Sequence, residues 1–173
     1  MKTRTLIACA LALQSVATAA FAQAAPAPSM LGGAVVRSIR ECQQVTIFDD
    51  VDARVEGDSV VLTGKVTAAA KRSEIEKRVG RLEGVRELRN EILVLPLVPE
   101  DDDLRHRVAK AIYSNPKFWS YAAMSSPPIH IIVERGHVTL KGMVGTQVER
   151  SMARSLATGL GERSLNDELT TER

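Results

Sequence analysis

Two stretches of the chain alternate apolar and polar positions with the period of two that is typical of a half-buried β-strand. The first covers residues 51–66 and the second covers residues 129–144. A glycine in a turn dipeptide divides each stretch, Gly57 in the first and Gly136 in the second. Alternation interrupted by such a dipeptide predicts a β-hairpin. We therefore expect one antiparallel hairpin in each half of the chain.

Helical spacing of apolar residues flanks both hairpins. The four segments with this spacing are residues 34–43, 75–82, 103–113 and 152–160. Residues 101–103 are all aspartate, and carboxylates at a helix start are favoured by the helix dipole. A further strand closes each half, at residues 85–95 and, with a weaker apolar pattern, at residues 165–170.

The two halves are copies of one another, because a shift of 78 positions aligns the hairpins. The identical pairs are Val55 with Val133, Glu56 with Glu134, Val60 with Val138, Leu62 with Leu140, Gly64 with Gly142 and Val66 with Val144. A glycine inside each return strand predicts a bulge or close packing under a helix. With a two-residue deletion, Asn90 also matches Asn166. An internal repeat of two copies predicts two separate globular units.

The element order is therefore α-β-β-α-β, twice. A strand-helix-strand crossover places the last strand parallel to a neighbour. The simplest packing puts both helices on one face of a three-stranded mixed sheet, which is an α+β fold. We expect the first unit at residues 34–98 and the second at residues 99–173, with Pro96 and Pro99 bounding the link. Units of this size are expected to be only modestly stable.

Residues 1–22 have the layout of a secretory signal peptide. A basic start precedes an apolar run from Leu6, and a small-x-small pattern predicts cleavage between Ala22 and Gln23. Lipidation of Cys9 is an alternative, although the apolar run should precede that cysteine and here it follows.

Residues 23–33 are rich in Ala, Pro, Ser and Gly, so we expect a flexible lead to the first unit. No second run of about 20 apolar residues follows, so no transmembrane helix is expected. The sequence thus predicts a protein exported to the periplasm.

Removal of the signal peptide changes the charge and cysteine content. Loss of Lys2 and Arg4 lowers the basic count from 23 to 21, which equals the acidic count of 21. No basic excess remains for the capture of nucleic acid, so no nucleic-acid partner is expected. Cys42 is then the only cysteine, either a small buried hydrophobe or one half of a disulfide between two chains. The oligomeric state stays open.

A short strand motif recurs in the same place in each copy. It reads Val-x-Leu-x-Gly-x-Val at residues 60–66 and 138–144, and a helix and an asparagine, Asn90 or Asn166, follow. The pattern resembles the BON domain of osmotically inducible periplasmic proteins, over nearly all of the chain that follows the lead. In the first copy Gly84 and Val85 follow the second helix. In the second copy residues 161–163 replace this pair, so its closing strand is expected to be frayed or differently paired.

The resemblance implies a non-enzymatic role at the cell envelope. Members of the family are associated with phospholipid and with envelope integrity under stress. Tandem copies behind a signal peptide are the usual layout of the periplasmic branch.

Aromatic residues make up 3% of the chain and cluster before the second hairpin, in or near a proline-containing loop over residues 114–128. The candidate lipid-binding residues there are Lys110, Tyr113, Lys117, Phe118, Trp119 and Tyr121. Amphipathic aromatics suit the headgroup layer of a membrane, and lysines suit anionic lipids. The same cluster suits a protein hot spot, and Phe118 and Trp119 would also serve to cap the core of the second unit.

Nothing in the sequence indicates a catalytic residue, a metal site or a cofactor. The three histidines, His106, His130 and His137, lack zinc spacing. The acidic run that begins at Asp49 lacks the pattern of a calcium loop and is interpreted as a polar edge. No nucleophile turn or phosphate loop is present.

Two functions therefore compete. The first is an envelope protein that touches a phospholipid surface through its second unit. The alternative is a protein-interaction module of an envelope assembly, in which an exposed sheet edge accepts a partner strand. A third possibility, an enzyme, has no motif to support it.

Overall fold

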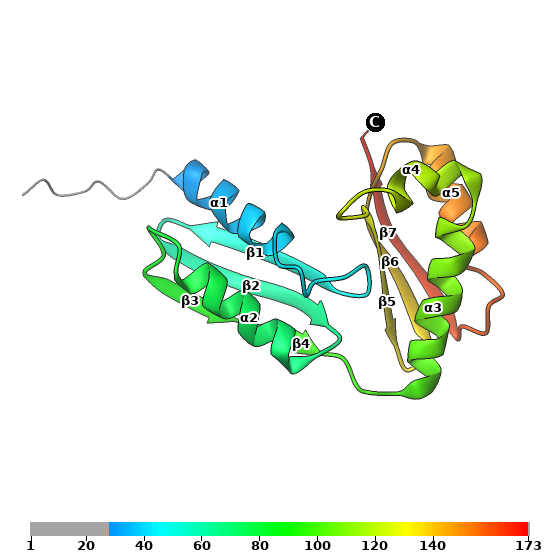
Figure 1. Ribbon diagram of the computed structural model, residues 1–173, viewed down its shortest axis with the longest axis horizontal. Coiled ribbons are helices and arrows are strands. Elements are labelled where there is room, and N and C mark those ends of the chain that lie inside the picture. The colour runs from blue at the N-terminus through cyan, green and yellow to red at the C-terminus, as the bar shows by residue number, and fades with distance from the viewer. Residues whose placement is uncertain (1–27, 173) are drawn as a thin grey trace, which may run out of the picture.

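The computed structural model describes residues 28–172, and Figure 1 shows two α/β units joined by a short link. The first unit consists of α1 (Pro28–Arg40), β1 (Asp50–Glu56), β2 (Ser59–Val66), α2 (Ala69–Gly80), β3 (Glu87–Asn90) and β4 (Leu93–Val94). The second consists of α3 (Pro99–Tyr113), η1 (Pro116–Phe118), α4 (Trp119–Ala122), β5 (Ile129–Glu134), β6 (His137–Val144), α5 (Gln147–Leu156) and β7 (Ser164–Thr171). The expected signal peptide and the start of the lead lie outside the described residues.

Both sheets have the same topology, with the return strand of the hairpin at the centre. β2 pairs antiparallel with β1 and parallel with β3 and β4, which together form one interrupted third strand. β6 pairs antiparallel with β5 and parallel with β7. The α+β class and the repeated α-β-β-α-β order are confirmed. Within the described residues no helix is long and apolar enough to cross a membrane.

The closing strand of the second copy is the more regular of the two, so the expected frayed edge is wrong. β7 pairs with β6 over all eight of its residues, whereas the third strand of the first copy is broken between Asn90 and Leu93. The expectation failed because it relied on the weak apolar pattern. Backbone pairing does not require apolar side chains on the open face of a sheet.

One face of each sheet packs under both of its helices. The buried first core contains Leu31, Val35, Ile39, Cys42, Val60, Leu62, Val66, Ile75, Val79 and Ile92. The buried second core contains Leu104, Val108, Ile112, Phe118, Ile129, Ile131, Val133, Val138, Leu140, Val144, Ala153, Ala157 and Leu169. Strand residues alternate between these cores and the opposite face of each sheet. Because both helices of a unit lie on the core side, no helix of that unit covers the opposite face. Cys42 is buried, as the hydrophobe interpretation requires.

Helix α1 begins earlier than the sequence pattern suggested. It starts at Pro28, so it includes residues 28–33, which had been assigned to the lead. Leu31 is 2% exposed and joins the first core, and this burial offsets the low helix propensity of the glycines that follow it. Helix α3 also starts early, at Pro99, where proline loses no helical hydrogen bond.

Gly64 and Gly142 occupy equivalent and crowded places. Their φ angles are +117° and +116°, in a region that L side chains avoid. A Cβ atom on Gly64 would lie 2.1 Å from the carbonyl oxygen of Asp50, and one on Gly142 would lie 1.8 Å from that of Pro128. The close neighbour is therefore the facing strand or the residue that leads into it, and not a helix.

The sheet register corrects one pair in the sequence alignment. Leu62 lies opposite Asn90, and Leu140 lies opposite Asp167. Asn90 therefore corresponds to Asp167 and not to Asn166. Between the hairpin and this position the second copy is shorter by one residue, and not by two as the sequence alignment suggested.

Asn90 and Asp167 make the same local bonds. The backbone carbonyl of each accepts from an arginine on the second helix of its unit, Arg72 at 3.2 Å or Arg150 at 3.2 Å. The side-chain oxygen of each accepts from the backbone N–H two residues later, at 3.2 Å and 3.1 Å. These side chains satisfy backbone N–H groups at equivalent places in the two closing strands, next to the break in the first copy and within the continuous β7 in the second.

Candidate functional site

The loop that leads to β5 begins with a short helical segment built on Asn115. The side chain of Asn115 accepts from the N–H of Lys117 at 3.0 Å, and Pro116 starts η1 where its missing N–H is not needed. Helix α4 continues directly from η1, so Phe118 and Trp119 point in different directions from the same turn.

Two of the candidate aromatics belong to the core. Phe118 is fully buried in the second core, and its ring centroid lies 6.0 Å from that of Tyr121. The hydroxyl of Tyr113 donates to the carbonyl oxygen of Ile129 at 2.7 Å, at the outer edge of β5. Burial raises the pKa of Tyr113 well above its ordinary value. Phe118 therefore anchors the loop in the core, and Tyr113 ties the end of α3 to the start of β5.

Tyr121 ties α4 to the start of α5. Its hydroxyl donates to the carboxylate of Glu149 at 2.9 Å and accepts from the N–H of Gly145 at 3.0 Å. Burial raises the pKa of Tyr121, and Glu149 adds to the rise although the N–H of Gly145 opposes it. Glu149 also completes a capping box with Thr146 and lies 3.6 Å from the ammonium of Lys117.

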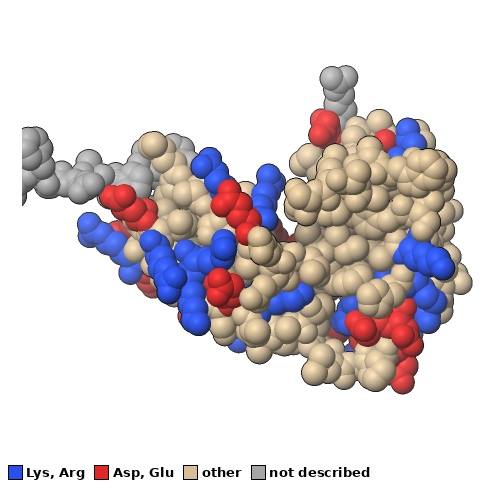
Figure 2. Space-filling model, viewed as in Figure 1, with Lys and Arg blue, Asp and Glu red and all other residues tan. Residues whose placement is uncertain are grey.

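Trp119 is the candidate aromatic that faces solvent. Its side chain is 61% exposed, and its indole N–H donates to the carbonyl oxygen of Ser114 at 3.3 Å. Met124 and Val148 are also exposed, on segments that Tyr121 holds together. We call Trp119, Met124 and Val148 the α4 tip. Figure 2 shows that the surface over α4 is largely uncharged, whereas charged side chains of both signs crowd the first unit.

A shallow basic hollow adjoins the α4 tip. It has a volume of about 540 Å³ and is lined by Arg107, Lys110, Ala111, Ser114, Asn115, Pro116 and Leu160. Ser114 connects the two features, because it lines the hollow and its carbonyl accepts the indole N–H of Trp119. The guanidinium of Arg107 donates to the carbonyl oxygen of Leu160 at 3.2 Å, and no carboxylate among the described residues forms an ion pair with Arg107 or Lys110. The hollow is therefore open to an anion.

The six candidates thus divide between surface and interior. Trp119, Lys117 and Lys110 are exposed, Tyr121 is half-buried, and Tyr113 and Phe118 serve the packing of the second unit. Sequence reasoning did not single out Arg107 or Val148, because Arg107 lies on α3 and Val148 on α5, outside the loop that contains the aromatic cluster.

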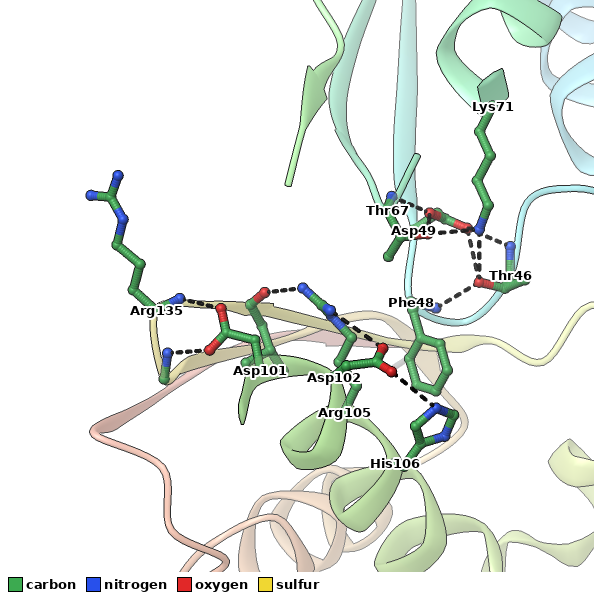
Figure 3. A network of polar contacts seen from close by, with 12 residues as sticks. Thr46, Phe48, Asp49, Thr67, Lys71, Asp101, Asp102, Arg105, His106 and Arg135 are labelled. Carbon is green, nitrogen blue, oxygen red and sulfur yellow. Dashed lines mark hydrogen bonds and ion pairs between the residues drawn. The ribbon is translucent and has the colours of Figure 1, made fainter. Parts of the chain in front are cut away.

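A second cluster joins the two units. The carbonyl oxygen of Ile47 accepts from the N–H of Ile131 at 2.7 Å, and that of Asp49 accepts from Nδ1 of His130 at 2.6 Å. Between them, the ring of Phe48 meets the ring of His106 edge-on, with centroids 5.1 Å apart (Figure 3). We call residues 46–49 the docking loop, because it places two main-chain acceptors and one aromatic ring against the second unit.

Asp49 itself is buried and fully bonded. Its carboxylate accepts from the backbone N–H and the hydroxyl of Thr46 at 2.7 and 2.8 Å, and from those of Thr67 at 2.7 and 2.9 Å. The ammonium of Lys71 lies 2.6 Å away (Figure 3). Burial alone would raise the pKa of Asp49, but the bonds from Lys71, Thr67 and Thr46 outweigh it and lower the pKa.

Ion pairs connect the open faces of the two sheets. Lys141 lies 2.6 Å from Asp50, and Lys65 lies 2.5 Å from Glu134. Burial lowers the pKa of Lys141, but Asp50 and nearby carboxylates outweigh it and raise the pKa above its ordinary value. These pairs border a cleft of about 370 Å³ between the units.

The sequence interpretation missed this seam. It assigned the acidic run from Asp49 to a polar edge, whereas Asp49 is buried and Asp50 pairs with the other unit. No residue spacing could reveal these contacts, because each joins segments far apart in the chain.

Comparison with known proteins yields one family and several similar solved structures, of which two are given below. The model of the BON domain matches residues 40–96 and residues 100–171. A search of the curated proteins finds no match. One similar structure is CdsD, a structural protein of the Type III secretion system of Chlamydia trachomatis, with 14% identity, 80% of this chain and 93% of that chain covered, and a TM-score of 0.28. A structure of the C-terminal domain of CdsD has 12% identity, coverages of 80% and 98%, and a TM-score of 0.28.

Proposed function

This chain belongs to the BON domain family, and we propose from that premise that it is a non-enzymatic, exported binding protein of the cell envelope. In this proposal the second unit touches a phospholipid surface through the α4 tip and supports the integrity of the envelope under stress. The observation that carries the proposal is Trp119, a large apolar ring that is 61% exposed near a hollow lined by Arg107 and Lys110, which form no ion pair with a carboxylate of residues 28–172.

The chemistry of the tip suits the boundary between water and lipid. An indole ring has an apolar body and a polar edge, and Met124 and Val148 are further exposed apolar side chains on the segments that Tyr121 joins. Lys110 and Arg107 line the hollow beside Ser114 and can face lipid phosphates. Lys117 contributes less, because Glu149 lies 3.6 Å from its ammonium.

The expected affinity is modest. Each cation near an anionic surface contributes about 1 kcal/mol, and burial of one large apolar side chain contributes about 2 kcal/mol. Lys110, Arg107 and Trp119 together give about 4 kcal/mol, which is a partition constant of roughly 1,000 because each 1.4 kcal/mol is tenfold. Binding should weaken as salt screens the cations.

Vesicle flotation tests this proposal with the chain from residue 23 onward. We expect binding to vesicles of phosphatidylglycerol and phosphatidylethanolamine, and little binding to pure phosphatidylcholine. Trp119→Ala should reduce recovery at least tenfold, whereas Leu97→Ala, at a side chain that is 92% exposed on the link, should not. Equal recovery of the Trp119→Ala variant and the unchanged protein with the floated vesicles would refute the proposal.

The alternative, a protein-interaction module, depends on open sheet edges. Along β5 the carbonyls of Ile129 and Val133 accept from side chains of α3, and the N–H of Ile131 donates to the docking loop. The outer edge of β7 is the edge that this alternative would use in the second unit. Crosslinking in intact cells separates the two functions, because lipid contact alone gives no defined partner band.

A further inference from the structure

The docking loop meets the second unit at one strand edge. Ile47 and Asp49 each offer a main-chain carbonyl to β5, and Phe48 packs against the second core between them. Main-chain bonds of this kind need the loop in one conformation, because both carbonyls must face outward together. The question is what fixes that conformation.

Asp49 fixes it from within the first unit. Its carboxylate bonds to Thr46 at the start of the loop, to Thr67 after β2 and to Lys71 on α2. The Asp49 side chain is 0% exposed, so its charge requires all of these partners to avoid a large desolvation penalty. The loop is therefore braced against two other segments of its own unit while its carbonyls point away from them.

The carboxylate of the brace exists in one copy of the repeat. With the shift of 78 positions, residues 46–49 correspond to residues 124–127, which read Met-Ser-Ser-Pro. Pro127 stands where Asp49 stands and has no carboxylate. In the second copy the hydroxyl of Tyr121 takes its place, because it accepts from the N–H of Gly145 and donates to Glu149, the counterparts of Thr67 and Lys71. The loop that Asp49 braces is the one whose carbonyls meet the other unit.

We propose that the brace formed by Asp49, Thr46, Thr67 and Lys71 makes the two units one body, by presenting the docking loop to the edge of β5. The brace thereby sets the direction of the α4 tip relative to the first unit. Asp49 and Lys71 are positioning residues in this arrangement, and they act through Ile47 and Phe48. The inference does not depend on what the α4 tip binds.

Hydrogen exchange at the amide of Ile131 tests the proposal in the chain from residue 23 onward, because this N–H donates across the seam. Asp49→Ala should raise the Ile131 exchange rate at least tenfold. Two amides serve as references: Leu62 reports the fold of the first unit, and Ile132, which pairs with Thr139, reports the fold of β5. Both should keep their protection. Asp58→Ala, which removes an exposed ion pair of the same unit, should leave Ile131 unchanged.

A second variant and a second signal keep the test decisive. Lys71→Met removes the cation of the brace and should have the same effect on Ile131. The ring protons of His106 should also shift in the NMR spectrum as Phe48 moves away. Unchanged protection of Ile131 in a variant that retains Leu62 protection overturns the proposal. Loss of Leu62 protection in both variants overturns it too, since the brace would then hold the fold of the first unit rather than its docking.

Discussion

Alanine in place of Gly64 or Gly142 is expected to destabilise the unit that contains it much more than alanine at other glycines. Both residues have φ angles near +117°, and both face a carbonyl oxygen at a distance that leaves no room for a methyl group. The same defect should therefore appear twice in one chain, once in each unit.

The size of the effect follows from the geometry. The added Cβ would lie 2.1 Å from an oxygen at Gly64 and 1.8 Å at Gly142, so the backbone must shift by more than an ångström to restore ordinary contact. Overpacking of this kind costs about 1–3 kcal/mol, and a left-handed conformation costs an L residue about 1–2 kcal/mol. The sum is about 2–5 kcal/mol. A unit of about 70 residues has a free energy of unfolding of about 4–10 kcal/mol, so this is a large part of the total.

Urea unfolding followed by NMR gives the stability of each unit separately. Gly57→Ala and Gly159→Ala are the matched controls, because these glycines have φ angles of +65° and +80° but nothing within 4 Å of the added atom. The controls should lose only the conformational part, about 1 kcal/mol. If Gly64→Ala or Gly142→Ala costs no more than its control, the close approach of the facing backbone is not what requires glycine there.

Three further changes test other parts of the structure. Phe118→Ala should lower the free energy of unfolding of the second unit by about 3–5 kcal/mol, whereas Trp119→Ala should change it by less than about 0.5 kcal/mol; thermal unfolding that ranks the two the other way contradicts their placement. Because the pKa of Asp49 is lower in the folded state than its ordinary 3.8, the unfolded chain binds that proton first as the pH falls. The stabilisation from Asp49 is therefore complete above that ordinary value and lost as the pH falls through the folded pKa, and an acid titration of Asp49→Asn should lack this step. Lys141→Met should reduce the effect of 1 M salt on Ile131 exchange, because salt screens the half-exposed pair with Asp50; an unaltered salt effect would show that this pair does not contribute to docking.

The fold could be predicted because its signals are local or repeated. Alternation, helical spacing and turn glycines are properties of a few neighbouring residues, and the repeat allowed each copy to support the other. The start of α1 was missed because Gly32 and Gly33 resemble a linker, although burial of Leu31 holds the helix together. The closing strand of the second unit was underrated because its backbone pairing with β6 and the bonds between Arg150 and Asp167 leave no apolar pattern.

The candidate site could be predicted only in part. Composition located the aromatic cluster, but it could not say that Phe118 turns inward while Trp119 turns outward, since the two are neighbours in sequence. The docking loop left no signal, because the repeat contains it once and its partners in the second unit lie more than 50 positions away. A comparison of the two copies cannot predict contacts that only one copy makes.

Trp119 is the only tryptophan of the chain, so its fluorescence reports on the α4 tip alone. The most direct measurement is quenching of this fluorescence by brominated anionic lipids in vesicles, with a water-soluble quencher in parallel. If the tip enters the headgroup layer, the emission shifts to the blue, brominated chains quench it, and the water-soluble quencher loses access. An emission spectrum and accessibility that stay the same at vesicle concentrations where the protein floats would contradict the account, because the protein would then bind through another surface.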